Sequence, residues 1–419
     1  MGNFASQNCD FARGSLSYLG FLDPLTALVV SFAFLGMMVY KRVNLGVTLT
    51  STGILLSLLT MEFSEIPGVF LETSTSALTV SLVLATFGIM LISQLYKETG
   101  LIGTMSETLG RLLRNAKLTV SLLPAVIGLL PVAGGALMSA PLVETEADKL
   151  ALKKDLKTYV NVWFRHTIFP VYPMSQVLIL TGALTGVSLA SLILRQVPVV
   201  IVMVVVGYLV AFRKVSAIQD SIQDGGLGPN LKSLLTAFSP ILTMILVVAI
   251  FGIDVSVAAF VGLAVLLLIT RPGLRTLSMP FRNTAIYGVT LAAYGAMLLR
   301  NVTVASGASD FIGSMIASES ISEVLLLMTV PAVLGFLVGS PSGAIAISLP
   351  MLAGTVNFTP STAALLYIAA YLGYLGAPTH LCLVLTADYF KCPLGRLYKY
   401  MIPSLAISFA AAISVYFLI

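Results

Sequence analysis

The feature that most constrains the fold is a series of apolar segments of roughly 17–25 residues, separated by short loops that hold nearly all the charged side chains. A segment of this length spans the hydrocarbon core of a bilayer as an α-helix. Only 10% of the residues are charged, whereas a soluble domain has about 25%, so the chain cannot cover a water-soluble surface. We therefore expect an all-α integral membrane protein embedded in the lipid bilayer.

We predict ten transmembrane helices, at about residues 24–41, 44–61, 77–96, 159–183, 187–212, 236–252, 255–270, 283–300, 361–388 and 398–418. Two further apolar segments, 118–143 and 325–353, contain several prolines and glycines, and a proline in a helix interior breaks the helix. Non-helical backbone is tolerated at membrane depth only where protein or water surrounds it. We interpret both segments as re-entrant hairpins, which enter the bilayer and return to the same side.

The positions of the basic residues favour this topology. With ten crossings and two hairpins, 19 of the 23 lysines and arginines fall on one side of the membrane, and only nine of those 19 would remain there if both hairpins crossed instead. Cytoplasmic loops carry an excess of basic residues, so that side is predicted to be cytoplasmic and both termini to lie outside the cell membrane. The same rule accounts for the net charge of +5, so no nucleic acid is expected as a partner.

The two halves of the chain match each other at a nearly constant offset. Residues 124–128 (PAVIG) match 331–335 (PAVLG) at an offset of 207, and Pro173 matches Pro378 at an offset of 205. An ordered series of such matches indicates a duplication. Five crossings and one hairpin in each half place the halves in opposite orientations, which is typical of secondary transporters. The predicted units are a first inverted repeat at 1–212, a cytoplasmic linker at 213–234 and a second inverted repeat at 235–419.

The hairpins and the helices after them resemble a known group of proteins. The segments that carry the resemblance are LLPAVIGLLPVAGGALMSAPLVE, WFRHTIFPVYPMSQ and GFLVGSPSGAIAISLP. They are similar to the ion-transporter superfamily of gluconate, citrate, dicarboxylate and arsenite carriers, and within it to the uncharacterised membrane family known as domain of unknown function 401. The resemblance implies a transporter that works by an elevator-like motion of its hairpin domains and forms a homodimer. Neither hairpin carries the Ser-Asn-Thr signature of the dicarboxylate carriers, so it implies no particular substrate.

The helices after the hairpins are themselves interrupted, at 170–173 and 373–378, near the middle of the bilayer. Paired interruptions of this kind indicate the binding site of a transporter. Each resulting helix start presents free N–H groups and a positive dipole end, which favour an anion such as a carboxylate. The predicted substrate-binding residues are Gly134, Gly135, Ser139, Arg165, His166, Pro173, Ser175, Gln176, Ser340, Ser342, Gly343, Ser348, Pro378, Thr379 and His380.

Other interpretations of these residues stay open at the level of sequence. An ionisable residue inside a membrane suggests a functional site, but Arg165 lies only two helical turns into its span and can instead extend to the cytoplasmic surface. His166 and His380 can be neutral packing residues. The hairpin serines can satisfy backbone groups or permit close helix packing.

The sequence contains no phosphate-binding loop and no Asp or Glu deep in a span, so neither direct use of ATP nor a carboxylate proton relay is expected. The predicted coupling ion is Na⁺, bound by backbone carbonyls at the hairpin tips and helix breaks, or H⁺, carried by His166 or His380. Of these, sodium is preferred, and no resident cofactor is expected. The three cysteines (Cys9, Cys382 and Cys392) have no metal or disulfide spacing and are predicted to be ordinary small residues.

The function predicted from these features is secondary active transport of a small anionic solute. A channel or an exporter with the same fold is an alternative, as is a membrane subunit of a larger complex. An intramembrane hydrolase with Ser342 as nucleophile and His380 as base is a further alternative. The duplication argues against it, because a catalytic dyad needs one copy of the hairpin and both copies keep the same framework. We therefore do not expect an enzyme.

Overall fold

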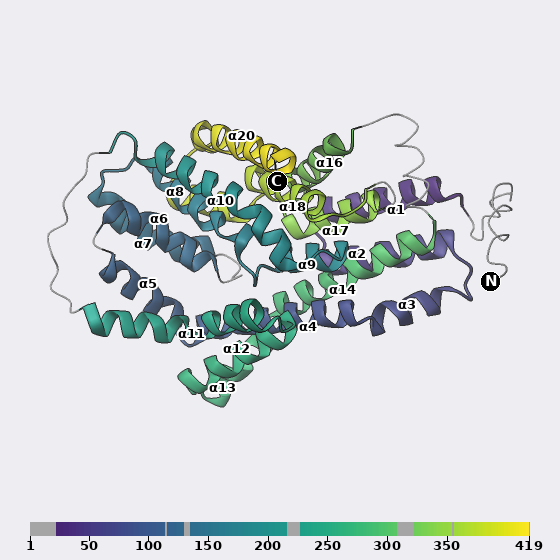
Figure 1. Cartoon of the computed structure of the whole chain (residues 1–419), viewed down its shortest axis with the longest axis horizontal. Coiled ribbons are helices and arrows are strands. Elements are labelled where there is room, and N and C mark those ends of the chain that lie inside the picture. Colours follow the sequence, from purple (N-terminus) through teal and green to yellow (C-terminus); the bar gives the residue numbers. More distant parts are fainter. Residues whose placement is uncertain are drawn as a thin grey trace, which may run out of the picture.

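The computed structural model describes residues 22–113, 115–129, 135–215, 227–307, 322–353 and 356–418. These residues form α-helices, two short 3-10 helices and connecting loops, and no β-strand occurs among them (Figure 1). The helices of the first half are α1 (Pro24–Tyr40), α2 (Leu45–Thr60), α3 (Ile66–Thr75), α4 (Ala77–Glu98), α5 (Leu101–Leu112), α6 (Ala116–Gly128), α7 (Gly135–Lys149), α8 (Lys154–Thr167), η1 (Phe169–Val171), α9 (Gln176–Thr185) and α10 (Leu189–Phe212).

The second half has a similar order of elements, with two apolar helices, a connector, a long helix, a pair of short helices, an interrupted helix and a final long helix. They are α11 (Leu227–Phe251), α12 (Val255–Thr270), α13 (Leu274–Ser278), η2 (Pro280–Arg282), α14 (Thr284–Ala305), α16 (Glu323–Val338), α17 (Pro341–Leu352), α18 (Pro360–Gly376), α19 (Leu381–Tyr389) and α20 (Leu394–Leu418). Helix α11 begins at Leu227, inside the segment predicted to be the linker.

Seven of the ten predicted crossings are long and apolar enough to span a bilayer: Ala77–Glu98, Lys154–Thr185, Leu189–Phe212, Leu231–Phe251, Thr284–Ala305, Pro360–Tyr389 and Leu394–Leu418. The other three, α1, α2 and α12, are apolar helices of 17, 16 and 16 residues. At 1.5 Å per residue they extend about 24–26 Å, slightly less than the hydrocarbon core of about 30 Å. The all-α membrane fold predicted from the sequence is confirmed.

The two segments predicted to be hairpins each form a pair of short helices that pack against each other, α6 with α7 and α16 with α17. These four helices have 13, 15, 16 and 12 residues, so each extends only about 18–24 Å. Each has a proline inside it, at Pro124, Pro141, Pro331 and Pro350. Because α16 is as long as α2 and α12, the pairing of the two helices and the proline in each, and not their length, are what match segments that return before crossing a bilayer.

The helices pack into two groups, which Figure 1 shows as an upper and a lower layer over much of the molecule. The hairpin group contains α6–α10 and α16–α20, and the scaffold group contains α1–α4, α11, α12 and α14. Helix α5 touches both groups through α6 and α11, and α14 and α4 pack on the hairpin group through α17 and α9. Both hairpins and both interrupted helices therefore belong to the same group.

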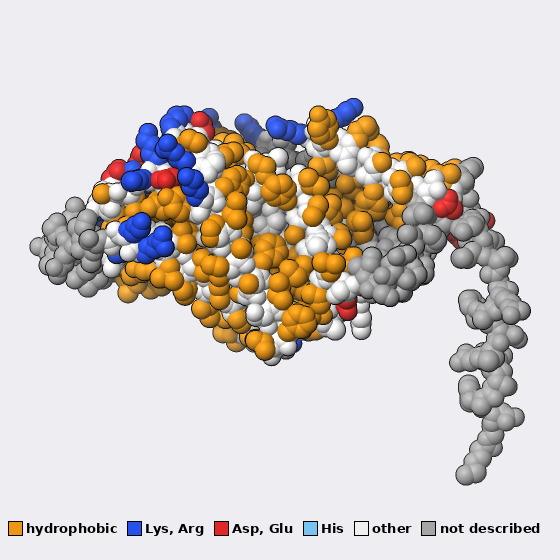
Figure 2. All heavy atoms as spheres, turned by 90° about the horizontal axis from the view of Figure 1, so that it is seen from above, with side chains coloured by type: hydrophobic (Ala, Val, Ile, Leu, Met, Phe, Trp, Pro, Cys, Tyr) orange, Lys and Arg blue, Asp and Glu red, His pale blue; other side chains and the backbone are white. Residues whose placement is uncertain are grey.

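The surface in Figure 2 is mostly hydrophobic, and its largest collection of Lys and Arg side chains lies at the end where Figure 1 shows α6, α7 and α8. On α10, for example, Leu194, Ile201 and Leu209 are each more than half exposed. Apolar patches of this extent are not found on soluble monomers, so lipid is the solvent that matches this surface.

Asp254 connects two helices of the scaffold group at the start of α12. Its carboxylate accepts hydrogen bonds from the Ser256 backbone N–H (2.8 Å) and from Ser81 of α4 (2.7 and 2.8 Å). Partial burial acts to raise the pKa of Asp254, but these hydrogen bonds outweigh it and hold the pKa below its ordinary value. A carboxyl whose pKa is lowered by folding stabilises the fold above its unfolded pKa of about 4 and loses that contribution as the pH falls.

Asp254→Asn should therefore melt at a lower temperature than the unchanged protein at pH 7, and the difference should shrink as the pH falls below about 4. The single tryptophan, Trp163, is buried, so its fluorescence can follow thermal unfolding in detergent between pH 7 and pH 3. A difference that stays constant over this range would show that the ionised carboxylate is not what stabilises this contact.

Candidate functional site

The first interrupted helix breaks around the predicted residues 170–173, whereas the second breaks at 377–380, later than the predicted start at 373, because α18 stays helical to Gly376. The first ends at Thr167 in α8 and resumes at Gln176 in α9, with η1 between them. The second ends at Gly376 in α18 and resumes at Leu381 in α19. Prolines at 170, 173 and 378 account for both breaks, because proline removes a backbone donor and disfavours helix at the residue before it.

Helices α9 and α19 begin at these breaks, and α17 begins at the tip of the second hairpin. The Ser340 side chain caps α17 by accepting a hydrogen bond from the Gly343 N–H at 3.3 Å. The residues at the N-cap positions of α9 and α19, Ser175 and His380, make no such bond. The first N–H groups of α9 and α19 thus have no side-chain cap and are available to an anion.

A cavity of about 190 Å³ lies inside the hairpin group at the level of both breaks. Its walls come from α8, η1, α9, α18 and α19, with the tip of α17 and the end of α6 closing it. The lining residues are Leu129, Arg165, His166, Phe169, Tyr172, Met174, Ser175, Gln176, Val177, Pro341, Tyr371, Tyr374 and Cys382. We call this space the central cavity.

Arg165 is the one arginine or lysine among these lining residues. Its side chain is 3% exposed, and its Nη1 forms no hydrogen bond with any part of the chain that the structure describes. The guanidinium lies against Gly135 at the start of α7, where a Cβ atom would collide with it. The alternative that Arg165 extends to the cytoplasmic surface is therefore wrong, because the side chain is directed into the protein.

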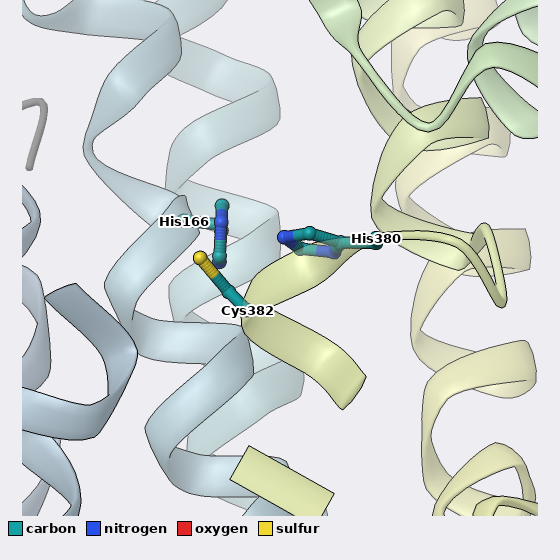
Figure 3. A group of neighbouring side chains, drawn as sticks. All are labelled: His166, His380 and Cys382. Atoms are coloured by element: carbon teal, nitrogen blue, oxygen red, sulfur yellow. The ribbon is translucent and has the colours of Figure 1, made fainter. Parts of the chain in front are cut away.

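His166 and His380 meet beside the cavity, with ring centroids 4.7 Å apart and nearly perpendicular planes (Figure 3). The Tyr374 hydroxyl lies between them, 3.3 Å from His166 Nε2 and 2.6 Å from His380 Nε2. Cys382 completes the group, and Figure 3 shows its sulfur next to His166. The two histidines, 214 residues apart in sequence, come from the two interrupted helices.

A second cavity of about 190 Å³ lies between the hairpin group and the scaffold group. It is lined by Asn44, Leu45, Leu49, Leu82, Thr86, Gln176, Leu180, Gly288, Val289, Ala292, Ala293, Ser340, Ser342 and Ala346. We call it the interface cavity. Gln176 lines both cavities, and its Nε2 has no hydrogen-bond partner among the described residues.

The structure brings together many of the residues predicted from the sequence. Arg165, His166, Ser175 and Gln176 line the central cavity, and Gln176, Ser340 and Ser342 line the interface cavity. Three more predicted residues lie beside these cavities. Gly135 contacts Arg165, and His380 contacts His166. The Gly343 N–H donates a hydrogen bond to Ser340.

Other predicted residues are placed elsewhere. Pro378 and Thr379 form an exposed turn before α19, and Pro173 does not line either cavity. Ser139 is fully buried in α7 and donates to the backbone oxygens of its own helix, Gly135 (3.4 Å) and Ala136 (3.2 Å). Ser348 is fully buried in α17 and lines neither cavity. Gly134 lies outside the described residues.

The residues of the central cavity that were not predicted include Tyr371, Tyr374 and Cys382. Tyr367, Tyr371 and Tyr374 follow one another at spacings of four and three residues, so they share one face of α18. This spacing in the sequence could have indicated that the tyrosines face a common site. Tyr371 donates a hydrogen bond to the His166 carbonyl oxygen at 2.8 Å. The prediction that Cys382 is an ordinary residue overlooked its neighbours, because those neighbours are distant in sequence.

Two solved membrane transporters have a similar fold. The YdaH transporter of Alcanivorax borkumensis superposes with a TM-score of 0.60 at 14% identity, over 85% of this chain and 87% of that one. MtrF of Neisseria gonorrhoeae, described as illuminating a class of antimetabolite efflux pumps, superposes with a TM-score of 0.54 at 13% identity, over 95% and 96% of the two chains. No curated protein matches the sequence.

At this level of identity, the two structures establish the likeness of fold and nothing about the solute. A family model identifies the chain directly, because it matches residues 24–419, which is nearly the whole sequence. The chain belongs to the membrane protein family described as Protein of unknown function (DUF401).

Proposed function

We propose that this protein is a secondary active transporter that moves a small anionic solute, such as a carboxylate, across the cell membrane. The observation that carries the proposal is the buried guanidinium of Arg165 in the central cavity, whose Nη1 has no hydrogen-bond partner among the described residues. A buried charge is costly unless it is paired, and no carboxylate side chain lines this cavity. A bound anion would supply the missing partner, and the uncapped N-termini of α9 and α19 would add to its binding.

The volume of the cavity limits the size of the solute. A cavity of roughly 150 Å³ can hold a benzene molecule, and drug-sized ligands occupy about 300–1,000 Å³. At about 190 Å³, the central cavity fits a solute somewhat larger than benzene. Its aromatic lining, with Phe169, Tyr172, Tyr371 and Tyr374, suits a solute that has an apolar part beside its anionic group.

Equivalent contacts in the two halves support the inverted duplication. Gly128 of α6 lies so close to α8 that a Cβ atom would collide with the Arg165 carbonyl oxygen. Gly335 of α16, 207 residues later, has the same relation to the carbonyl oxygen of Ala370 in α18. We propose that residues 1–212 and 235–419 are inverted repeats, with re-entrant hairpins and with both termini outside.

The separation into two helix groups supports an elevator-like mechanism. The central cavity is built by the hairpin group alone, whereas the interface cavity lies between that group and the scaffold group. Small residues such as Gly288, Ala292 and Ala346 line the interface. A solute held within one group can be carried past the other along a surface with few interlocking side chains, and a homodimer would anchor the scaffold group.

The interface cavity suits a coupling cation. Thr86, Ser340 and Ser342 provide neutral oxygen ligands there, which match Na⁺, and none of the described residues that line it is an Asp or Glu. We therefore keep Na⁺ as the proposed coupling ion, with H⁺ on the histidine pair as the alternative. The protein would then act as a carrier and not as a channel or an enzyme.

A thermal-shift screen of the purified protein tests the proposal. Small carboxylates and inorganic anions, each with sodium or with choline as the cation, should raise the melting temperature by mass action, and more so with sodium. A 100-fold excess over Kd corresponds to about 2.7 kcal/mol. Neutral amides of the same acids provide a matched control. If those amides, and not the acids, stabilised the protein, the anion assignment would be wrong.

Uptake by proteoliposomes separates the carrier from a channel on the same fold. A carrier should show saturable uptake of the stabilising anion that depends on an inward sodium gradient. Flux that rises linearly with concentration and ignores the gradient would indicate a channel.

A further inference from the structure

We propose that His166, His380 and Cys382 form a binding site for a divalent transition-metal ion, with zinc as the best match. One ligand atom from each residue, two imidazole nitrogens and one sulfur, lies within 4.8 Å of both others (Figure 3). Two of the residues are buried and the third is half-buried. Residues of this chemistry seldom converge inside a membrane without a role, since polar groups there are costly.

The hydrogen bonds around His166 prepare it to be a ligand. Its Nδ1 lies 2.6 Å from the Val162 carbonyl oxygen, and a carbonyl can only accept, so Nδ1 carries the proton. The other nitrogen, Nε2, then has a free lone pair that faces His380 and Cys382. A metal-binding histidine commonly has its second nitrogen bonded to a backbone carbonyl in this way, which holds the ring in the required tautomer.

Without a cation, the hydrogen-bonding capacity of the two imidazole rings is only partly used. The Tyr374 hydroxyl has one proton and lies near both Nε2 atoms, so it can donate to only one of them. His380 is 1% exposed, and its Nδ1 has no hydrogen-bond partner in the part of the chain that the structure describes. A metal ion would accept the Nε2 lone pairs and a lone pair from the Cys382 thiolate, whose proton is released on binding.

The donor set selects the metal. Two imidazoles and one thiolate suit Zn²⁺, and they match neither Na⁺, Mg²⁺ nor Ca²⁺, which prefer oxygen. Zinc–nitrogen and zinc–sulfur bonds of about 2.0–2.3 Å place tetrahedral ligands about 3.5 Å apart, so small side-chain rotations would close the site. Three protein ligands leave the fourth position open, as in zinc sites that bind a further molecule.

His166 and Cys382 both line the central cavity, so the open position would face the space that holds Arg165. Zinc with one thiolate carries a single positive charge, and Arg165 adds another. Two positive charges in a buried cavity favour the binding of an anion, and one anion would contact both the zinc ion and the guanidinium. This last step rests on the proposed function, whereas the metal site itself rests on the three side chains alone.

Cobalt replaces zinc in such sites and reports its ligands by absorption. Co²⁺ added to the metal-stripped, full-length protein in detergent should give visible bands of a tetrahedral ion and a near-ultraviolet thiolate-to-cobalt band, both displaced by Zn²⁺. Cys382→Ser should remove the thiolate band and weaken zinc binding at least about 100-fold. Cys392→Ser is the matched control, because Cys392 is a buried cysteine that is not part of this cluster.

His380→Gln provides a second variant in case Cys382→Ser does not fold. It should keep a thiolate band but lose the tetrahedral pattern. Arg165→Gln should bind Co²⁺ at least as tightly as the unchanged protein, since a repulsive charge is removed, while losing the anion response. A tetrahedral thiolate spectrum with no anion response would retain the metal site and reject the proposed solute. Absence of the spectrum, or its loss in Cys392→Ser alone, would overturn the metal site.

Discussion

Arg165→Gln should reduce the affinity for the transported anion by about 10–150-fold, because a hydrogen bond to a charged group is worth about 1.5–3 kcal/mol. The guanidinium is buried in the central cavity, and its Nη1 has no hydrogen-bond partner in the part of the chain that the structure describes, so an anion bound there would be its principal partner. Glutamine keeps a polar side chain, although a shorter one, and removes the charge. Isothermal titration with the anion found in the thermal-shift screen measures the change directly, and proteoliposome uptake should fall in parallel.

Arg195→Gln is the matched control for this experiment. Arg195, in α10, also has a buried Nη1 without a hydrogen-bond partner among the described residues, but it lies away from both cavities. Its removal should leave the anion affinity within about twofold. Equal effects of the two substitutions would mean that net charge, and not the position of Arg165, governs anion binding.

The second large effect concerns the packing of the second hairpin on α18. A Cβ atom on Gly373 would overlap the backbone of Ala332 in α16, and backbone cannot move aside as a flexible side chain can. Gly373→Ala should therefore destabilise the protein by about 1–3 kcal/mol and lower its melting temperature. It should also weaken solute binding, because the next residue, Tyr374, lines the central cavity.

Gly395→Ala makes the same chemical change where there is room for it. Nothing lies within 4 Å of a Cβ atom at Gly395 in α20, so the substitution should be neutral or stabilise by up to about 1 kcal/mol through helix propensity. The difference in melting temperature between the two variants isolates the packing contribution. If Gly373→Ala melted at the same temperature as Gly395→Ala, the close contact between α16 and α18 would not support the fold.

The sequence predicted the helices and their interruptions well, because both depend on local chemistry. Apolar segments of membrane length and interior prolines act within a few residues of where they occur, as at Pro170 and Pro378. Arg165 and His166 could be singled out for the same reason, since a charged or titratable group inside an apolar span is conspicuous.

The rest of the site depends on contacts that no local pattern records. Cys382 acquires its importance from His166, on the other interrupted helix, and Tyr374 from lying between two histidines. The prediction for Pro378 and Thr379 followed from their position at a break, but the structure exposes both, with Thr379 against Gly339 at the tip of the second hairpin. A break in a helix therefore indicates the level of the site without specifying which of its residues face inward.

Gln176 gives the two cavities a common wall, and its amide has two chemically different ends. The carbonyl oxygen attracts a cation and the NH₂ group attracts an anion, so one orientation of the side chain can serve an ion on one side and a solute on the other. Occupation of either cavity would then favour the orientation that suits the second ligand. Thermodynamic linkage makes such an effect reciprocal: the factor by which sodium tightens the binding of the anion equals the factor by which the anion tightens the binding of sodium. A single uncharged side chain would in this way couple the transport of the anion to the transport of the cation.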